Sequence, residues 1–287
     1  MDCRRSNYDS IGVYEMFAVR TCPEAIMHRN VRALSRGLAL INELNASGPS
    51  NVLHLAKRTG LNRTTCYRLL DTLREDGYVT FDETNALFGL TPQVRTLSEG
   101  VSSRDLSSQA ALPAMFGLLD EVSWPSDFGV FELGSVLIRE STHPFSPFSV
   151  HRSMVGRRRS LVRSALGKAI LAASSPPLRR EMLEMTASLV EEDADLAKDR
   201  RFVSEILLQT KEDGYASSVG GSEAGISAIA LAIPGGGPVL GSLNLIFFSS
   251  SMTPEGAAKK YLPSMRVAVK EIERRWSAAN KARGKLT

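Results

Sequence analysis

The chain has 287 residues, about twice the usual length of a single domain, which favours two domains that each bury their own core. Hydrophobic residues make up 43% and charged residues 23% of the chain, as in an average folded protein, so composition excludes a disordered or low-complexity chain. No run approaches about 18 uncharged apolar residues, and Asp9 and Glu15 interrupt the N-terminal stretch that a signal peptide would need. We therefore expect a cytoplasmic protein with no membrane contact.

Neither metal nor cofactor chemistry is indicated by the residues that usually provide it. Cys3, Cys22 and Cys66 form no CxxC motif and lie far in sequence from the four histidines, so we expect no disulfide framework and no metal site. The glycine run at 235–237 lies between two predicted strands rather than before a helix, so it does not predict a nucleotide site.

Positive charge is concentrated in two clusters. Residues 29–74 contain eight basic side chains against two acidic ones, and residues 139–163 contain six arginines against one glutamate. Because the net charge of the whole chain is only +4, each cluster requires its own anionic partner or structural role.

Periodicity divides the chain into four parts. Residues 1–28 show neither helical nor strand periodicity, and we interpret them as a disordered tail or an over-long start. Residues 29–91 predict a first domain, and residues 92–105 predict a linker helix. Residues 106–280 are expected to form a separate second domain.

In the first domain, apolar periodicity predicts a helix ending near Gly48, a short helix ending at Gly60 and a third helix ending at Gly77. Two strands at 78–81 and 87–90 surround a turn-rich segment. Three helices followed by a hairpin are typical of the winged helix-turn-helix. The first helix is expected to face the core with Leu34, Leu38, Ile41 and Leu44.

The exposed side of the third helix is the expected DNA-reading surface. Its residues are arginines, threonines and a tyrosine near the N-terminus, and such residues suit the major groove, where arginine bonds guanine and a threonine methyl contacts thymine. An ordinary solvated face is the alternative, and Tyr67 could instead pack over the hairpin. The expected DNA-binding residues are Asn62, Arg63, Thr64, Thr65, Tyr67 and Arg68, with Arg32 and Arg36 on phosphates.

The linker segment and the second domain have distinct patterns. Val94, Leu97 and Val101 form a narrow apolar seam that predicts a helix pairing with its copy in a dimer. The second domain alternates strands and helices without a βαβ rhythm, which predicts an α+β fold with an antiparallel sheet flanked by helices. Its expected helices lie at 106–121, 164–173, 179–189, 202–213 and 254–276, and its expected strands at 128–133, 136–140, 226–233 and 239–248.

Segments from the first helix to the last strand pair carry a family resemblance, at residues 32–44, 55–73, 77–78, 90–91, 164–171, 211–215 and 226–230. They resemble the IclR family of bacterial transcriptional regulators, and only the N-terminal tail falls outside the resemblance. The resemblance implies a GAF/profilin-like effector-binding domain and a regulator rather than an enzyme. The implied partners are a double-stranded DNA operator, a small effector, RNA polymerase and further copies of the chain in a homodimer or homotetramer.

Three segments of the second domain support a narrower resemblance. Residues 124–127, 139–143 and 148–158 look most like those of activators of 3-hydroxyphenylpropionate and phenylpropanoid catabolism. This resemblance implies activation of an aromatic-acid catabolic operon. The family's sensors of small acids carry acidic and cysteine residues near 222–228, whereas this chain has Ser222, Glu223, Ser227 and Ala228, which argues against a glyoxylate-like effector.

An aromatic carboxylate needs one cationic partner inside an otherwise apolar pocket. Arg139 lies on a predicted strand and is the expected carboxylate partner, whereas the three consecutive arginines at 157–159 cannot all point inward. The resemblance implies a further anion site, since Ser164 and Ala165 lie where the family's pocket uses backbone N–H groups beside a helix start. The expected effector-binding residues are Arg139, His151, Arg152, Ser164, Ala165, Glu223, Ser227 and Ala228.

Four alternatives remain at this stage. The regulator could be a repressor that responds to a different small organic acid, or a DNA-binding protein that responds to redox state through Cys3 and Cys22. An enzyme with an incidental winged helix is disfavoured because no local catalytic signature is present. A structural nucleoid protein would not need a second domain of this size.

Overall fold

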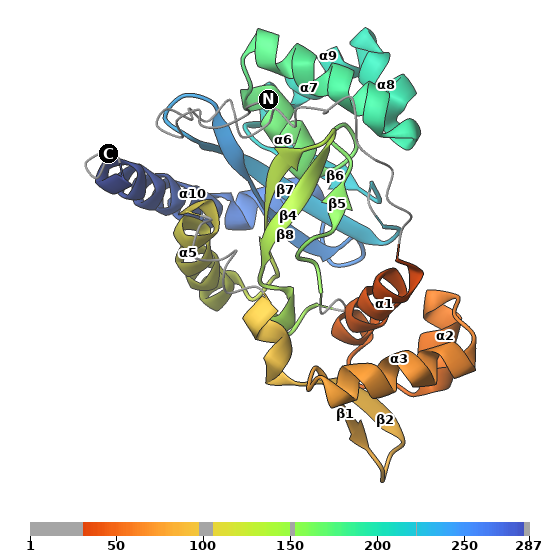
Figure 1. Cartoon of the computed structure of the whole chain (residues 1–287). Coiled ribbons are helices and arrows are strands. Elements are labelled where there is room, and N and C mark those ends of the chain that lie inside the picture. The colour runs from red at the N-terminus through yellow and green to blue at the C-terminus, as the bar shows by residue number, and fades with distance from the viewer. Residues whose placement is uncertain (1–30, 98–105, 150–152, 222, 284–287) are drawn as a thin grey trace, which may run out of the picture.

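The computed structural model of the protein describes residues 31–97, 106–149, 153–221 and 223–283. Figure 1 shows a small group of elements formed by the N-terminal part of the chain and a larger α+β group formed by the rest. The predicted tail at 1–28 lies outside the described residues. In the part of the chain that is described, no helix is long and apolar enough to cross a membrane.

The N-terminal group is a winged helix-turn-helix. Its elements are α1 (Arg32–Ser47), α2 (Val52–Thr59), α3 (Arg63–Glu75), β1 (Val79–Asp82) and β2 (Leu87–Leu90). The two strands pair antiparallel and form the wing. The predicted order of three helices and a hairpin is confirmed.

Asparagine side chains cap the N-termini of α2 and α3. The Asn51 side chain accepts a hydrogen bond from the N–H of His54, and the Asn62 side chain accepts one from the N–H of Thr65 at 2.7 Å. Gly60 ends α2 in the left-handed conformation, at a φ of 71°, which glycine adopts without steric cost. These local signals determine where each helix begins and where the chain turns.

The structure corrects part of the predicted inward face of α1, because Leu44 is buried as expected but Leu34 and Leu38 are exposed. Leu40 and Leu44 are fully buried against α2 and α3, whereas Leu34 is 62% and Leu38 49% exposed. The helix carries apolar residues on two sides, and both sides satisfy spacings of three and four. Only the positions of the other helices decide which side is buried.

The predicted linker helix falls largely outside the described residues. A 3-10 turn at Pro92–Arg95 continues into helical residues at 96 and 97, and residues 98–105 are not described. The side chain of Leu97 is 57% exposed and that of Val94 is half-buried. The pairing of this segment with a second copy stays a prediction.

The C-terminal group contains a six-stranded antiparallel sheet in the order β5-β4-β3-β8-β7-β6. β7 and β8 are apolar almost throughout because both of their faces are covered by helices. The strands are β3 (Asp127–Glu132), β4 (Ser135–Ser141), β5 (Arg158–Arg159), β6 (Ala216–Val219), β7 (Ile226–Pro234) and β8 (Val239–Phe248).

Helices cover both faces of this sheet (Figure 1). On one face, α5 and α10 pack against each other, α10 packs against β7, and α5 packs against β3 and β4. On the other face, α6 packs against β7 and β8, and α9 packs on α6. The helices are α5 (Leu106–Val122), α6 (Ala165–Ala173), α7 (Pro176–Leu189), α8 (Ala194–Lys198), α9 (Arg200–Asp213) and α10 (Pro254–Arg283). The predicted α+β fold with a flanked antiparallel sheet is confirmed, although β5, β6 and α8 were not predicted because they are short and polar.

The start of α6 approaches the preceding chain very closely. A Cβ added at Gly167 would collide with the backbone of Leu161, including its carbonyl oxygen. Both residues are at the base of the buried cluster under β4, so this backbone cannot move without opening the core. The contact brings the first turn of α6 against the sheet.

We predict that Gly167→Ala lowers the free energy of unfolding by about 2 kcal/mol or more, because the added methyl overpacks a backbone contact. Chemical denaturation followed by circular dichroism measures the effect. Gly117→Ala is the matched control, since Gly117 lies in α5 with nothing within 4 Å of its Cβ position and alanine favours a helix. Equal midpoints for the two variants would contradict the prediction.

Candidate functional site

The first candidate site is the exposed face of α3. Arg63, Thr64, Tyr67 and Arg68 are exposed there, whereas Cys66 and Leu70 on the opposite face are fully buried. An exposed helix that follows a tight turn and precedes a wing has the geometry with which helix-turn-helix domains enter the major groove. The structure therefore presents these predicted side chains together on one face.

Two predicted residues of this face also have structural contacts. The Asn62 side chain caps α3 through the N–H of Thr65, so it helps to orient the helix. The ring of Tyr67 lies edge-on to Phe88 of the wing, with centroids 6.5 Å apart, while half of the side chain stays exposed. Tyr67 thus contacts the hairpin and remains accessible.

Further basic side chains lie on α1 and α2 of the same domain. Arg32 and Arg36 are exposed near the start of α1, and Arg58 at the end of α2 forms an ion pair with Glu43 at 3.2 Å. Burial raises the pKa of Glu43, but hydrogen bonds from Ser47 and Arg58 and the charge of Arg58 outweigh burial and hold the pKa below its ordinary value. This pair connects α2 to α1 and compensates part of the charge of Arg58.

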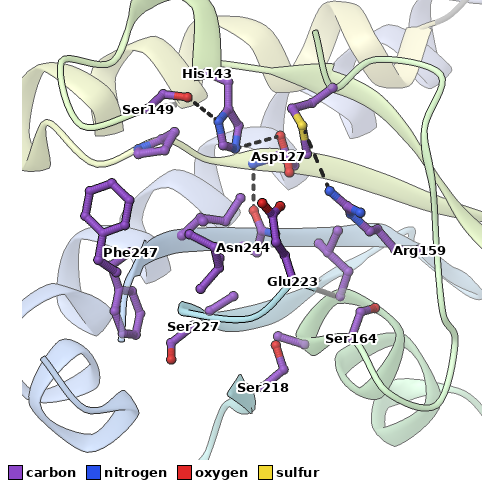
Figure 2. Close-up of a pocket in the computed structure, with 18 of the residues that line it drawn as sticks. Asp127, His143, Ser149, Arg159, Ser164, Ser218, Glu223, Ser227, Asn244 and Phe247 are labelled. Carbon is purple, nitrogen blue, oxygen red and sulfur yellow. Dashed lines mark hydrogen bonds and ion pairs between the residues drawn. The ribbon is translucent and has the colours of Figure 1, made fainter. Parts of the chain in front are cut away.

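The second candidate site is a cavity in the C-terminal domain, between the sheet, the start of α6 and the chain after β4 (Figure 2). About 660 Å³ of empty space lies within and in front of it, open solvent at its mouth included. Strands β3, β7 and β8 and helix α6 all contribute to its wall. One side of the cavity is polar and the other aromatic.

The polar side is built on β3, β8 and the 3-10 turn at His143–Phe145 that follows β4. The Asn244 side-chain oxygen accepts a hydrogen bond from the N–H of Asp127 at 2.7 Å, and His143 Nδ1 lies 2.5 Å from Ser149 Oγ. His143 Nε2 lies 3.9 Å from Asp127 Oδ1, and both side chains are almost completely buried. Figure 2 shows Asp127, His143 and Arg159 directed into the same side of the cavity.

Arg159 brings a guanidinium into this polar side. Its Nη2 lies 3.9 Å from the sulfur of Met154, which also lines the cavity. Burial lowers the pKa of Arg159, and the carboxylates of Asp127 and Glu223 oppose the shift, so both acidic groups act on this arginine. Among the described lining residues it is the one arginine, and there is no lysine.

The aromatic side is formed by phenylalanines from β8 and from the chain after β4. Phe148, Phe247 and Phe248 line the cavity, and Trp124 packs behind them with its ring 4.6 Å from that of Phe148. Such rings offer flat apolar surface to an aromatic ligand. The cavity therefore combines a guanidinium with a place for a ring.

Five predicted effector-binding residues lie in the wall of this cavity: Ser164, Ala165, Glu223, Ser227 and Ala228. The hydroxyl of Ser164 accepts a hydrogen bond from the N–H of Gly167 and so caps α6. The hydroxyl of Ser227 lies 2.8 Å from that of Ser249. Whether these residues contact an effector stays a prediction.

Three predicted effector-binding residues are not placed in the wall. Arg139 does not line the cavity, and its guanidinium forms an ion pair with Glu132 at 2.7 Å. The structure therefore corrects the expected carboxylate partner, because Arg139 lies on the sheet beside an acidic neighbour on the adjacent strand. His151 and Arg152 lie outside the described residues.

Among the lining residues that sequence reasoning missed are the acidic, imidazole, guanidinium and amide side chains of Asp127, His143, Arg159 and Asn244. A signal existed for two of them. Asn244 interrupts the apolar run of β8, and a polar residue in a buried strand usually has a specific partner. In β5, Arg158 points to Glu132. Arg159, the next residue, therefore points to the opposite face of the sheet, because side chains alternate along a strand.

The order Ser149, His143, Asp127 resembles that of a hydrolase triad, although no such arrangement was expected from the sequence. The histidine and aspartate of a triad share a hydrogen bond, and the 3.9 Å between His143 and Asp127 exceeds that length.

In the described part of the chain, no group of three His, Cys, Asp or Glu side chains could hold a metal ion.

Two family models match the chain. The model described as the IclR helix-turn-helix domain matches residues 33–83, and the model described as the bacterial transcriptional regulator IclR C-terminal matches residues 99–274. Together they include both candidate sites.

Curated relatives are regulators of transcription. An uncharacterized HTH-type transcriptional regulator of Escherichia coli, RhmR, is 27% identical over 154 residues, which are 54% of this chain and 58% of that protein, so the match spans less than two thirds of RhmR. The p-hydroxybenzoate hydroxylase transcriptional activator of Acinetobacter baylyi is 26% identical over 84% of this chain and 90% of its own length.

Solved structures share the fold. IclR of Thermotoga maritima superposes with a TM-score of 0.61 at 16% identity, over 86% of this chain and 99% of that one. An IclR homologue of Microbacterium hydrocarbonoxydans, solved in complex with 4-hydroxybenzoate, has a TM-score of 0.59 at 21% identity over 86% and 99%. Because the two family models match most of the chain, the protein belongs to the IclR family of bacterial transcriptional regulators.

Proposed function

We propose that this protein controls an aromatic-acid catabolic operon, as an activator, and that a small aromatic carboxylate bound in the cavity is its effector. One observation carries the proposal. Arg159 is the one arginine among the described lining residues of the cavity, and phenylalanines line the other side. An aromatic acid requires both features, one for each end of the molecule.

In the proposed complex, the carboxylate binds Arg159 beside the start of α6, where the N–H groups around Ala165 add positive potential. The ring lies against Phe247 and Phe248. A short aliphatic acid could use the guanidinium but would leave these rings uncovered, so an aromatic acid makes better use of the whole cavity.

Two similar proteins of low sequence identity support this choice of ligand. One relative is named as an activator for p-hydroxybenzoate hydroxylase, and one structural neighbour was solved with 4-hydroxybenzoate. p-Hydroxybenzoate and 4-hydroxybenzoate are the same compound, an aromatic acid.

On the DNA side, α3 is proposed to read an operator as part of a homodimer or homotetramer, because two half-sites need two recognition helices. RNA polymerase is the further partner of an activator. Effector binding can change DNA binding only if the effector prefers one arrangement of the two recognition helices. The coupling then acts in both directions, so operator DNA changes effector affinity by the same factor.

The redox alternative has little support in the described part of the chain. Cys66 is fully buried, and burial raises the pKa of its thiol, so little reactive thiolate forms. Cys3 and Cys22 lie outside the described residues. A repressor that responds to another organic acid stays the main alternative. The ligand screen below tests the class of acid, and transcription from the operator with and without the effector tests the sign of regulation.

We predict that the purified protein is stabilised by aromatic carboxylates. Thermal-shift and calorimetric screening should compare 3-phenylpropionate, cinnamate and benzoate with short keto acids. A ligand that binds only the folded state adds about 2.7 kcal/mol of stability at a hundredfold excess over its Kd. Stabilisation by the keto acids alone, with no effect of any aromatic acid, would overturn the aromatic-acid proposal.

We predict that Arg159→Ala weakens binding of the aromatic acid by about tenfold to a hundredfold, because a hydrogen-bonded charge pair is lost. Arg139→Ala is the matched control, and it should bind the acid as the wild type does because Arg139 pairs with Glu132 outside the cavity. Isothermal titration calorimetry gives both constants. The opposite ranking of the two variants would return the carboxylate site to Arg139.

We predict that Arg68→Ala weakens binding to a cognate operator relative to random DNA by about 1 to 3 kcal/mol, as expected for loss of an arginine bonded to guanine. The operator is first selected from a random DNA pool, and fluorescence anisotropy measures both affinities. Arg201→Ala, an exposed arginine on α9, is the control and should leave both unchanged. An equal loss on both DNAs would instead identify Arg68 as a phosphate contact.

A further inference from the structure

A hydrogen bond joins the two domains at a point distant from the linker in sequence. The side-chain amide of Asn45 donates to Ser153 Oγ at 2.9 Å, and the two residues lie 108 positions apart. Asn45 is near the end of α1, and Ser153 precedes β5 in the C-terminal domain. Of the first three helices, α1 lies toward the C-terminal domain (Figure 1). This contact ties the winged helix-turn-helix directly to the domain that contains the cavity.

Asn45 lies on the side of α1 that faces away from its own domain. Leu38 precedes Asn45 by about two helical turns, so the two side chains share one side of the helix. The side chain of Leu38 is 49% exposed, whereas Leu44 is buried against α2 and α3. The contact with the C-terminal domain can therefore form and break without any change in the core of the winged helix-turn-helix.

Ser153 begins a short segment, residues 153–157, which we call the strap. The N–H of Arg157 donates to the carbonyl oxygen of Met154 at 3.0 Å, which closes a tight turn. The N–H of Gly156 donates to the carbonyl oxygen of Ile138 on β4 at 2.9 Å, which attaches the turn to the sheet. Because the turn is so short, a displacement of Met154 also moves its neighbour Ser153.

Met154 connects the strap to the cavity. Its side chain lines the cavity, is only 2% exposed, and places its sulfur 3.9 Å from Arg159 Nη2. A thioether sulfur is a weak acceptor, whereas a carboxylate forms a short, charge-assisted hydrogen bond with a guanidinium group. A carboxylate that binds Arg159 therefore replaces this sulfur and displaces Met154.

We propose that the Asn45–Ser153 hydrogen bond is an autoinhibitory latch that effector binding opens. The closed latch holds the winged helix-turn-helix against the C-terminal domain, so the two recognition helices of a dimer are not free to adopt the spacing of two half-sites. When a carboxylate displaces Met154, the strap moves Ser153 away from Asn45. The inference rests on the proposed function, because it needs a carboxylate on Arg159, and it adds the route by which binding reaches the DNA-binding domain.

Thermodynamic linkage gives the direction of each effect. Operator DNA and effector both prefer the open latch, so a mutation that opens it raises the affinity for each of them. The same mutation lowers, by the same factor, the increase in operator affinity that the effector causes. The net contribution of one hydrogen bond between neutral side chains corresponds to a change of about twofold to tenfold.

The first test needs no ligand. Asn45→Ala and Ser153→Ala should each raise the affinity of the full chain for the selected operator by about twofold to tenfold, measured by fluorescence anisotropy. The double variant should gain no more than either single variant, because both changes remove one hydrogen bond. Asn42→Ala, an exposed asparagine on the same helix, is the matched control and should leave the affinity unchanged.

Two results of this test would overturn the latch. One is an operator affinity that stays the same or falls in either single variant. The other is a double variant whose change in binding free energy is the sum of the two single changes, because additive effects show that the two side chains act independently.

The second test uses 3-phenylpropionate, cinnamate and benzoate as probes. By calorimetry, Asn45→Ala should bind each acid that the wild type binds about twofold to tenfold more tightly, and the acid should raise its operator affinity by a smaller factor than in the wild type. Equal binding by the two proteins would overturn the latch and leave the proposed function intact. If none of the three acids binds the wild type, the proposed function fails, and the ligand-free operator affinities decide whether the latch controls DNA binding.

Discussion

The short antiparallel contact between β3 and β8 is the constraint on which the C-terminal domain depends. Phe128 pairs with Leu243 and Gly129 with Ser242, and this contact joins the β3–β4–β5 half of the sheet to the β6–β7–β8 half. A Cβ at Gly241 would lie 2.5 Å from the carbonyl oxygen of Gly129, so the strands meet this closely only with glycine there. The polar side of the cavity is assembled at the same contact, since the residues next to it include both Asp127 and its hydrogen-bond partner on β8.

The arginines of the second basic cluster, at residues 139–163, have different structural roles. Arg163 forms an ion pair with the buried Asp193 and connects the chain before α6 to the helices beyond it. Arg139 and Arg158 share Glu132 on the sheet. Only Arg159 lines the cavity among the described arginines, because strand alternation turns it away from its neighbour. Three arginines of this cluster therefore stabilise the fold, and Arg159 is the described one that lines the cavity.

The two candidate sites differ in how their chemistry is organised. On α3, all the polar side chains come from one helix, so their common exposure follows from helical periodicity alone. In the cavity, the guanidinium, the carboxylate, the imidazole and the phenylalanines come from separate strands and loops. The family fold provides the position of such a cavity, and the side chains in its wall determine which small molecule is bound.

The sequence by itself was sufficient for the winged helix-turn-helix, the α+β class and most element boundaries, because caps, glycine turns and apolar periodicity act within a few residues. It also placed the helix start at Ser164 in the cavity wall. Only the tertiary structure decided that Leu40 rather than Leu34 faces the core, and that Arg159 rather than Arg139 lines the cavity. Both choices depend on which elements pack against a given face, and that information comes from segments distant along the chain.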